Sequence, residues 1–166
     1  MAFENHPYIE TLRLDTRFFK TVTYTYTLRE PGFIAVTPQS IYTVDPEGYA
    51  LELLENDFVY QSLPHIEISN ELDLATKVIF TEHLDDVQAI HEVLQNRELA
   101  SGQFVLDTFS STIRYIHTQG WYILFAMGYD LTEQLNTLET LLEDTIDDPS
   151  TLEYIDLRVE NWIYYK

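Results

Sequence analysis

The stretch that most limits the possible folds is residues 21–27, Thr-Val-Thr-Tyr-Thr-Tyr-Thr, where β-branched and aromatic residues alternate with period two. This alternation is typical of a β-strand, because successive side chains point to opposite faces of the sheet. One face of the strand carries Val22, Tyr24 and Tyr26. Residues 8–14 alternate similarly, so the two segments predict a hairpin connected by residues 15–20.

Further short strands are expected along the chain, each bounded by proline, glycine or other turn residues. They are residues 33–36, 40–44, 49–54, 104–106, 112–117, 121–125, 154–158 and 162–165. Asp45-Pro46-Glu47-Gly48 predicts a tight turn, because proline presets φ at its second position and glycine closes it. Residues 62–66 are expected to be an extended passage held by Pro64.

Two helices are expected between these strands. In residues 81–99, apolar residues recur at the helical period at Val87, Ile90, Val93 and Leu94. A second helix begins after Asp130, a good N-cap with Glu133 three residues on, and ends near Thr145. The predicted fold class is therefore α+β, with a mostly antiparallel sheet of hairpins packed with two main helices.

Charge and composition exclude several classes of function. The 166 residues include 28 acidic and 9 basic side chains, a net charge of −19. Phosphate neutralisation needs clustered lysine and arginine, so nucleic-acid binding and attachment to an anionic membrane surface are both disfavoured. The chain has no cysteine, which removes disulfides and thiol catalysis. No window of about 18 apolar residues predicts a membrane span.

No residue pattern points to a catalytic, cofactor-binding or metal-binding site. The five histidines are scattered, and none pairs with another at a spacing of three or four: His6, His65, His83, His91 and His117. An acidic cluster lacks the alternating ligands and central glycine of a calcium loop: Glu143, Asp144, Asp147 and Asp148. Asp156 and Arg158 share a strand face and are expected to form a structural pair.

The last thirteen residues, 154–166, combine two runs of strand formers with a turn or bulge at 159–161 and contain no glycine or proline. A terminal strand at a sheet edge is a natural place for another chain to add a strand. Ile155 and Leu157 are expected in the protein's own core. Trp162 and Tyr164 fit a core position or a binding surface equally well.

The order of motifs resembles the FtsQ/DivIB family of bacterial cell-division proteins. The resemblance rests on six motifs in family order: His6-Pro7-Tyr8-Ile9 with Leu12-Arg13-Leu14 and Arg17-Phe18, Arg29-Glu30-Pro31, Tyr42-Thr43-Val44-Asp45 with Gly48, Leu63-Pro64-His65-Ile66, Gly120-Trp121, and Tyr154-Ile155-Asp156-Leu157-Arg158. Phe19 and Leu28 replace a proline and a glutamate that are usual in the family.

The resemblance implies a domain organisation and a function. Residues 1–30 would be the C-terminal part of a POTRA-like domain, and residues 31–166 a β domain. The protein would be the extracytoplasmic part of a single-pass membrane protein at the division septum, not an enzyme. It would recruit FtsB-like or DivIC-like and FtsL-like partners by strand addition. The partner-binding residues it implies are Tyr154, Asp156, Arg158, Trp162, Tyr164 and Tyr165.

Two other hypotheses remain open at this point. An acidic carbohydrate-active or metal-dependent enzyme would need a deep pocket lined by convergent carboxylates. A chaperone-like POTRA relative would bind many unrelated client strands, whereas a scaffold would be selective.

Overall fold

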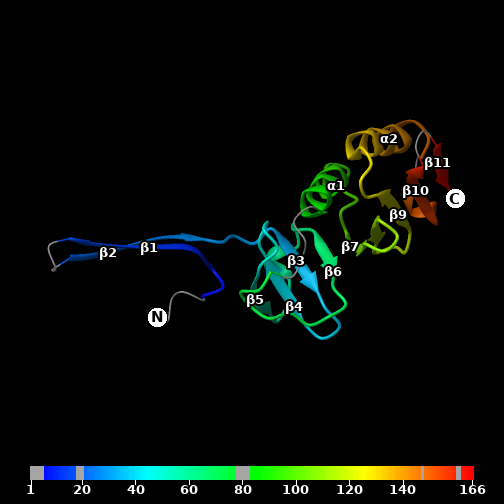
Figure 1. The fold of residues 1–166 in the computed structure, drawn as a ribbon. Coiled ribbons are helices and arrows are strands. Elements are labelled where there is room, and N and C mark those ends of the chain that lie inside the picture. The colour runs from blue at the N-terminus through cyan, green and yellow to red at the C-terminus, as the bar shows by residue number, and fades with distance from the viewer. Residues whose placement is uncertain (1–5, 18–20, 78–82, 147, 160–161) are drawn as a thin grey trace. The chain divides into compact units, whose positions relative to one another are not determined.

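The computed structural model describes residues 6–17, 21–77, 83–146, 148–159 and 162–166 (Figure 1). Its class is α+β with two helices and mostly antiparallel strand pairs, which confirms the predicted class. Contacts divide the chain into two compact units, Met1–Leu63 with Ser69–Thr81, and Pro64–Ile68 with Glu82–Lys166. The predicted boundary at residue 30 stays a prediction.

The first unit begins with the predicted hairpin of β1 (Ile9–Arg17) and β2 (Thr21–Leu28). The two strands pair antiparallel, with Leu14 opposite Tyr24. The expectation that residues 15–17 belong to the connection is wrong, because each of them pairs with a residue at the start of β2. Residues 18–20 lie outside the described residues.

Three short antiparallel strands follow in this unit: β3 (Phe33–Val36), β4 (Ile41–Val44) and β5 (Ala50–Leu54). Their buried side chains, among them Ile34, Val44 and Leu51, form its core. The predicted turn joins β4 to β5, with the Gly48 amide donating to the Asp45 carbonyl. Gly48 has a φ of 87°, the left-handed region that favours glycine.

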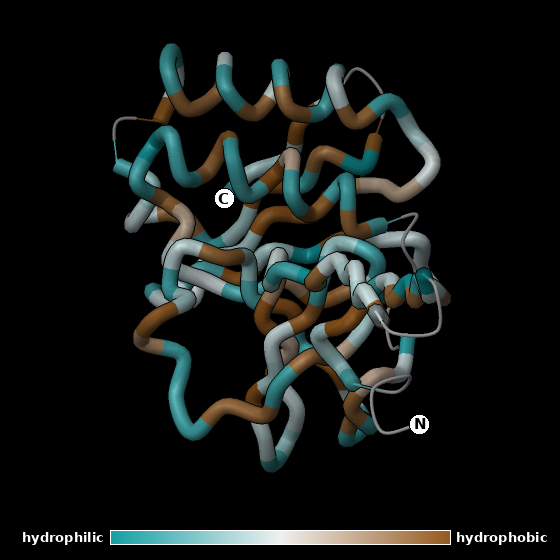
Figure 2. Tube along the Cα trace, turned by 90° about the vertical axis from the view of Figure 1, so that its left-hand side faces the viewer, coloured by the Kyte–Doolittle hydropathy of each residue, from teal (hydrophilic) through white to brown (hydrophobic). Residues whose placement is uncertain are grey.

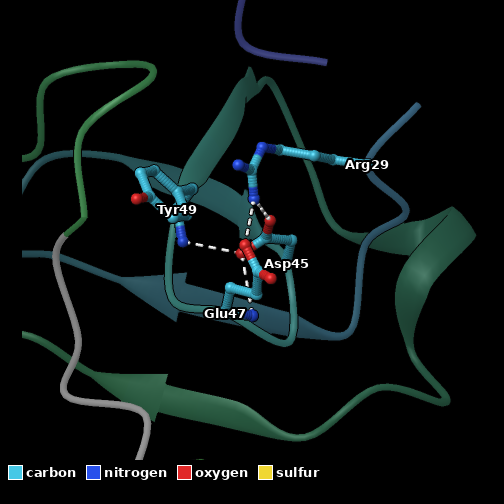
Figure 3. A network of polar contacts seen from close by, with 4 residues as sticks. All are labelled: Arg29, Asp45, Glu47 and Tyr49. Carbon is cyan, nitrogen blue, oxygen red and sulfur yellow. Dashed lines mark hydrogen bonds and ion pairs between the residues drawn. The ribbon is translucent and has the colours of Figure 1, made fainter. Parts of the chain in front are cut away.

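A polar network ties the segment after β2 to this turn (Figure 3). The Arg29 guanidinium donates to the buried Asp45 carboxylate and to Glu47, and it lies 4.0 Å from the centre of the Tyr49 ring. Asp45 also accepts the backbone N–H groups of Glu47 and Tyr49 at 3.0 and 2.7 Å. A buried charge of this kind is tolerated because it is both paired and hydrogen-bonded.

Backbone bonds attach the rest of the first unit to β5. The amide of Ala75 donates to the carbonyl of Ala50, and the amide of Ala50 donates to Thr76. A 3-10 turn, η1 (Phe58–Tyr60), precedes this part of the chain. Its Phe58 and Val59 are strongly exposed.

The described residues of the second unit form six strands. They are β6 (His65–Glu67), β7 (Gly102–Asp107), β8 (Thr112–His117), β9 (Tyr122–Ala126), β10 (Tyr154–Val159) and β11 (Trp162–Tyr165). Their order is β11-β10-β9-β8-β7-β6. Adjacent strands are antiparallel except in the pairs β6–β7 and β9–β10, which are parallel. The sequence predicts five of these strands, whereas β6 falls where only an extended passage over residues 62–66 is expected. The two parallel pairs were not predicted.

Each parallel pair is joined through a helix, as a parallel connection requires. The chain passes from β6 through α1 (Leu84–Asn96) to β7, and from β9 through α2 (Leu131–Asp144) to β10. Figures 1 and 2 show α1 and α2 side by side on the same side of these strands. The first helix ends sooner than residue 99, because Glu98 adopts a left-handed φ of 59° that stops it.

Aromatic rings fill the core between the strands and the helices. The rings of Phe104 and Tyr115 have centroids 5.1 Å apart, and His117 stacks on Trp121 at 4.6 Å. The helices contribute five buried side chains to this core: Val87, Ile90, Leu94, Leu138 and Leu141. Among the described residues, no helix combines the length and apolar character needed to cross a membrane.

Candidate interaction edge

The C-terminal end of the second unit is positioned by the start of α2. Gly128, with a φ of 81°, turns the chain out of β9. The Asp130 carboxylate then accepts the backbone N–H of Thr132 at 2.9 Å, which confirms the predicted N-cap. Both features help to position the first turn of α2. The helix contacts β10 and covers the side of that strand that faces the core.

The two faces of β10 have different roles. Ile155 and Leu157 are 0% and 5% exposed, which confirms that they belong to the core. The intervening Asp156 lies on the opposite face and is half-buried. The pairing of β10 with β9 places Tyr154 opposite Tyr122 and Asp156 opposite Leu124. The predicted site residues of β10 are therefore the ones that face away from the helices.

Asp156 and Arg158 form the predicted pair. The Arg158 Nε and Nη2 donate to the two carboxylate oxygens at 2.9 and 2.6 Å, and the Arg158 backbone N–H donates to the same group. The hydrogen bonds from Arg158 hold the pKa of Asp156 below its usual range. The guanidinium is thereby held in one orientation at the surface, although its side chain remains 40% exposed.

The last strand, β11, stands at the end of the sheet order. Its inner edge pairs antiparallel with β10, and Asp156 lies opposite Tyr164. The register of this pairing shifts between Asp156 and Val159. Among the described residues no strand pairs with its outer edge. Trp162, Tyr164 and Tyr165 are 67%, 52% and 48% exposed. The edge thus combines free backbone groups with large, exposed aromatic side chains.

A row of stacked side chains continues on the helix-free face. The rings of Tyr154 and Tyr122 stack with centroids 5.8 Å apart. The guanidinium carbon of Arg114 lies 5.6 Å from the centre of the Tyr122 ring. Because Asp156 and Tyr164 lie opposite each other, this face continues to the edge strand. Tyr154, Asp156 and Tyr164 are therefore brought together on it.

A groove of about 660 Å³ runs between α2 and the β10–β11 hairpin. Its lining comes from both elements and from the turn before α2: Tyr129, Asp130, Glu133, Gln134, Asn136, Thr137, Leu157, Arg158, Val159, Trp162 and Ile163. Trp162 and Arg158 are predicted site residues that line it. Tyr165 and Ile155 are opposite each other, so Tyr165 takes the helix side.

The groove residues of α2 were missed from the sequence. Asp130, Glu133, Gln134 and Thr137 recur at helical spacing beside the leucine stripe, which indicates a polar helix flank. That signal does not show what the flank faces. The neighbour is β10–β11, and only long-range packing places it there.

The described residues contain no group of three or more His, Asp or Glu side chains arranged to hold a metal ion. Within the acidic cluster, hydrogen bonds from the side chain and the backbone N–H of Ser150 lower the pKa of Asp148. The backbone bond also caps the 3-10 turn η3 (Pro149–Thr151). Asp147 lies outside the described residues. In the groove, the Asp130 carboxylate is occupied by the helix cap.

No protein-family model matches the chain, and no curated protein matches it either. The FtsQ/DivIB resemblance therefore rests on the ordered motifs of the sequence alone.

Proposed function

We propose that this chain is a non-enzymatic scaffold domain that binds an extended segment of a partner protein at the outer edge of β11. The proposal depends on two features that occur together at this edge: an unpaired strand edge and exposed aromatic side chains. An unpaired strand edge ends the sheet, and Trp162, Tyr164 and Tyr165 are all about half exposed or more beside it. Exposed edges are normally shielded in monomeric proteins, so an open aromatic edge favours a binding role.

Strand addition explains how the edge would provide affinity. Backbone N–H and C=O groups along β11 would bond to the added strand, each bond contributing about 0.5–1.5 kcal/mol. Alternate side chains of the added strand would meet two different surfaces. One set would face Tyr164 and the stacked tyrosines, and the other would face Tyr165 and the helix side.

The groove supports the proposal because it lies between α2 and the β10–β11 hairpin, on the side of the sheet that faces the helices. Trp162 is 67% exposed and lines the groove together with residues of α2. An apolar side chain of the partner inserted there would bury the indole, and an aromatic anchor of this kind contributes about 2 kcal/mol or more. On the helix-free face, the guanidinium of Arg158, held by Asp156, would select a polar or acidic neighbour in the partner.

The resemblance supplies the class of partner. We propose a bitopic division protein of the FtsB or DivIC type, together with an FtsL-like protein, and an extracytoplasmic location at the division septum. The FtsQ/DivIB-type β domain and a partial POTRA hairpin belong to the same proposal. The order of motifs supports it, together with the observed hairpin at Ile9–Leu28 and the terminal edge strand.

The test is calorimetric binding of a peptide from the segment that follows the coiled coil of such a partner. Trp162→Ala and Tyr164→Ala should each weaken binding by about tenfold or more. Phe109→Ala is the matched control, because Phe109 is 99% exposed in the turn between β7 and β8, away from β11 in the strand order. It should leave affinity unchanged.

Peptides with proline or N-methyl substitutions provide a second measurement. If main-chain pairing carries the affinity, substitution at alternate positions should abolish binding while the intervening positions tolerate it. Unchanged affinity of both aromatic variants, with folding intact, would remove the proposed site. Binding of many unrelated extended peptides with equal affinity would instead favour the chaperone-like hypothesis.

A further inference from the structure

The hairpin β1–β2 has one polar face and one exposed apolar face. On the first face, Thr11 and Thr27 share a hydrogen bond of 2.5 Å, and Arg13 lies 3.4 Å from Asp15. This face also carries Arg17 and the remaining threonines of β2. Its polar groups can hydrogen-bond to one another and to solvent, so this face does not need an apolar cover.

The opposite face is apolar and open. Strand pairing places six large side chains on it: Leu12, Leu14, Val22, Tyr24, Tyr26 and Leu28. Their exposed fractions range from 37% to 58%, and none of the six carries a charge. A two-stranded hairpin is at best marginally stable alone in water, so this face requires a covering surface.

The size of the face suits a partner of equal size. Six side chains exposed to this degree present roughly 600 Å² of mostly apolar surface, at the upper limit for a patch on a monomeric protein. Two such faces packed together would bury about 1,200 Å² in total, the lower limit for a specific protein interface. An interface at this lower limit is typical of weak association, so we expect a dimer whose population depends on concentration.

The charge distribution makes this face the least repelled surface when two copies approach. Residues 1–30 hold four basic and four acidic side chains, so the whole net charge of −19 belongs to residues 31–166. Two copies repel each other over most of their surfaces. The charged side chains Arg13, Asp15 and Arg17 lie on the hairpin's polar face, and Glu10 lies at the register irregularity near the start of β1, so the centre of the apolar face carries no charge.

We propose that the apolar face of the β1–β2 hairpin binds the same face of a second copy of the chain. The contact is isologous, because the same patch serves both copies, and it closes at two chains. Two hairpins stack at the usual distance of about 10 Å between packed sheets. This association uses the first unit, whereas the β11 edge belongs to the second, so each succeeds or fails without the other.

The test is sedimentation of the whole chain over a concentration series in the micromolar range. Tyr24→Glu should weaken dimerisation by at least about tenfold, because it places a charge at the centre of the apolar face. Thr25→Glu is the matched control, with the same added charge one residue along on the polar face, and should change the Kd by less than about threefold. Tyr24→Phe keeps the apolar area and should keep the dimer.

Salt gives an independent readout. Added sodium chloride should tighten the dimer, since it screens repulsion between two acidic chains and leaves apolar packing intact. A photo-crosslinking phenylalanine analogue in place of Tyr26 should attach to residues 12–28 of the second copy. A monomer at every concentration, a dimer unaffected by Tyr24→Glu, or crosslinks to another surface would each overturn the proposal.

Discussion

The side-chain amide of Gln134 pairs with both backbone groups of Ala126. Its Oε1 accepts the Ala126 N–H at 2.8 Å, and its Nε2 donates to the Ala126 carbonyl at 3.1 Å. A buried residue of α2 thus acts as a one-residue strand partner for the end of β9. This contact fixes the helix that forms one wall of the groove.

Replacing Gln134 by leucine should destabilise the second unit by about 2–4 kcal/mol, because two backbone groups would lose their partners inside the protein. Urea unfolding followed by tryptophan fluorescence measures the change, since both tryptophans, Trp121 and Trp162, lie in this unit. Asn136→Ala, an exposed change on the same helix, should stay within about 0.5 kcal/mol. An unchanged urea midpoint for Gln134→Leu would contradict the role of the amide.

His117 should make the second unit sensitive to mild acid. Its Nδ1 accepts the backbone N–H of Gln119 at 3.2 Å, so the neutral ring carries its proton on Nε2, 2.9 Å from the Ser101 hydroxyl. Burial lowers the pKa of His117. Protonation would also break the bond from Gln119, because Nδ1 would then be a donor.

A lowered folded-state pKa means that His117 favours folding above its unfolded pKa of about 6.5 and that this stability is lost as pH falls through the folded value. In a Trp162→Phe background, the fluorescence of Trp121, stacked on His117, should change over the same range. His117→Phe should remove both effects. Acid dependence that persists in this variant would assign them to other groups.

Asp156 and Arg158 should contribute a small stability that disappears in strong acid. Hydrogen bonds from Arg158 lower the folded-state pKa of Asp156. The contribution is therefore present above the unfolded pKa of about 3.9 and is lost as pH falls through the folded value. Arg158→Gln should cost about 0.5–1 kcal/mol at neutral pH, as expected for a partly exposed pair. The difference between the two proteins should vanish at the acid end of a urea-unfolding series, and a constant difference would contradict the pairing.

Arg29→Ala should destabilise the first unit by about 3 kcal/mol, because it leaves the buried Asp45 carboxylate without its cation. Arg29→Lys should recover only part of this, since lysine lacks the planar fork and the stacking on Tyr49. Hydrogen exchange of the β3–β5 amides is the suitable measurement. Arg13→Ala removes a highly exposed ion pair and should change protection little.

Elements with a strong local pattern were predictable from the sequence. The hairpin of β1 and β2, the turn at Asp45–Gly48, and the cap at Asp130 follow from side-chain alternation, turn chemistry and capping, which act between near neighbours. The Asp156–Arg158 pair belongs to the same group, because its members are two residues apart on one strand. The burial of Ile155 and Leu157 followed from alternation in the same way.

The sequence by itself thus determined most of the strands, both helices, several turns and the acidic charge, but not β6 or the ends of β1 and α1. Tertiary structure decided that α1 and α2 each join two parallel strands, that β11 stands at an edge, and that α2 forms a groove with Trp162. It also decided that one face of the β1–β2 hairpin lies open. Strand order and the covering of whole surfaces depend on contacts between residues far apart in the chain. Periodicity shows which face of a strand is apolar, but it does not show which surface covers that face.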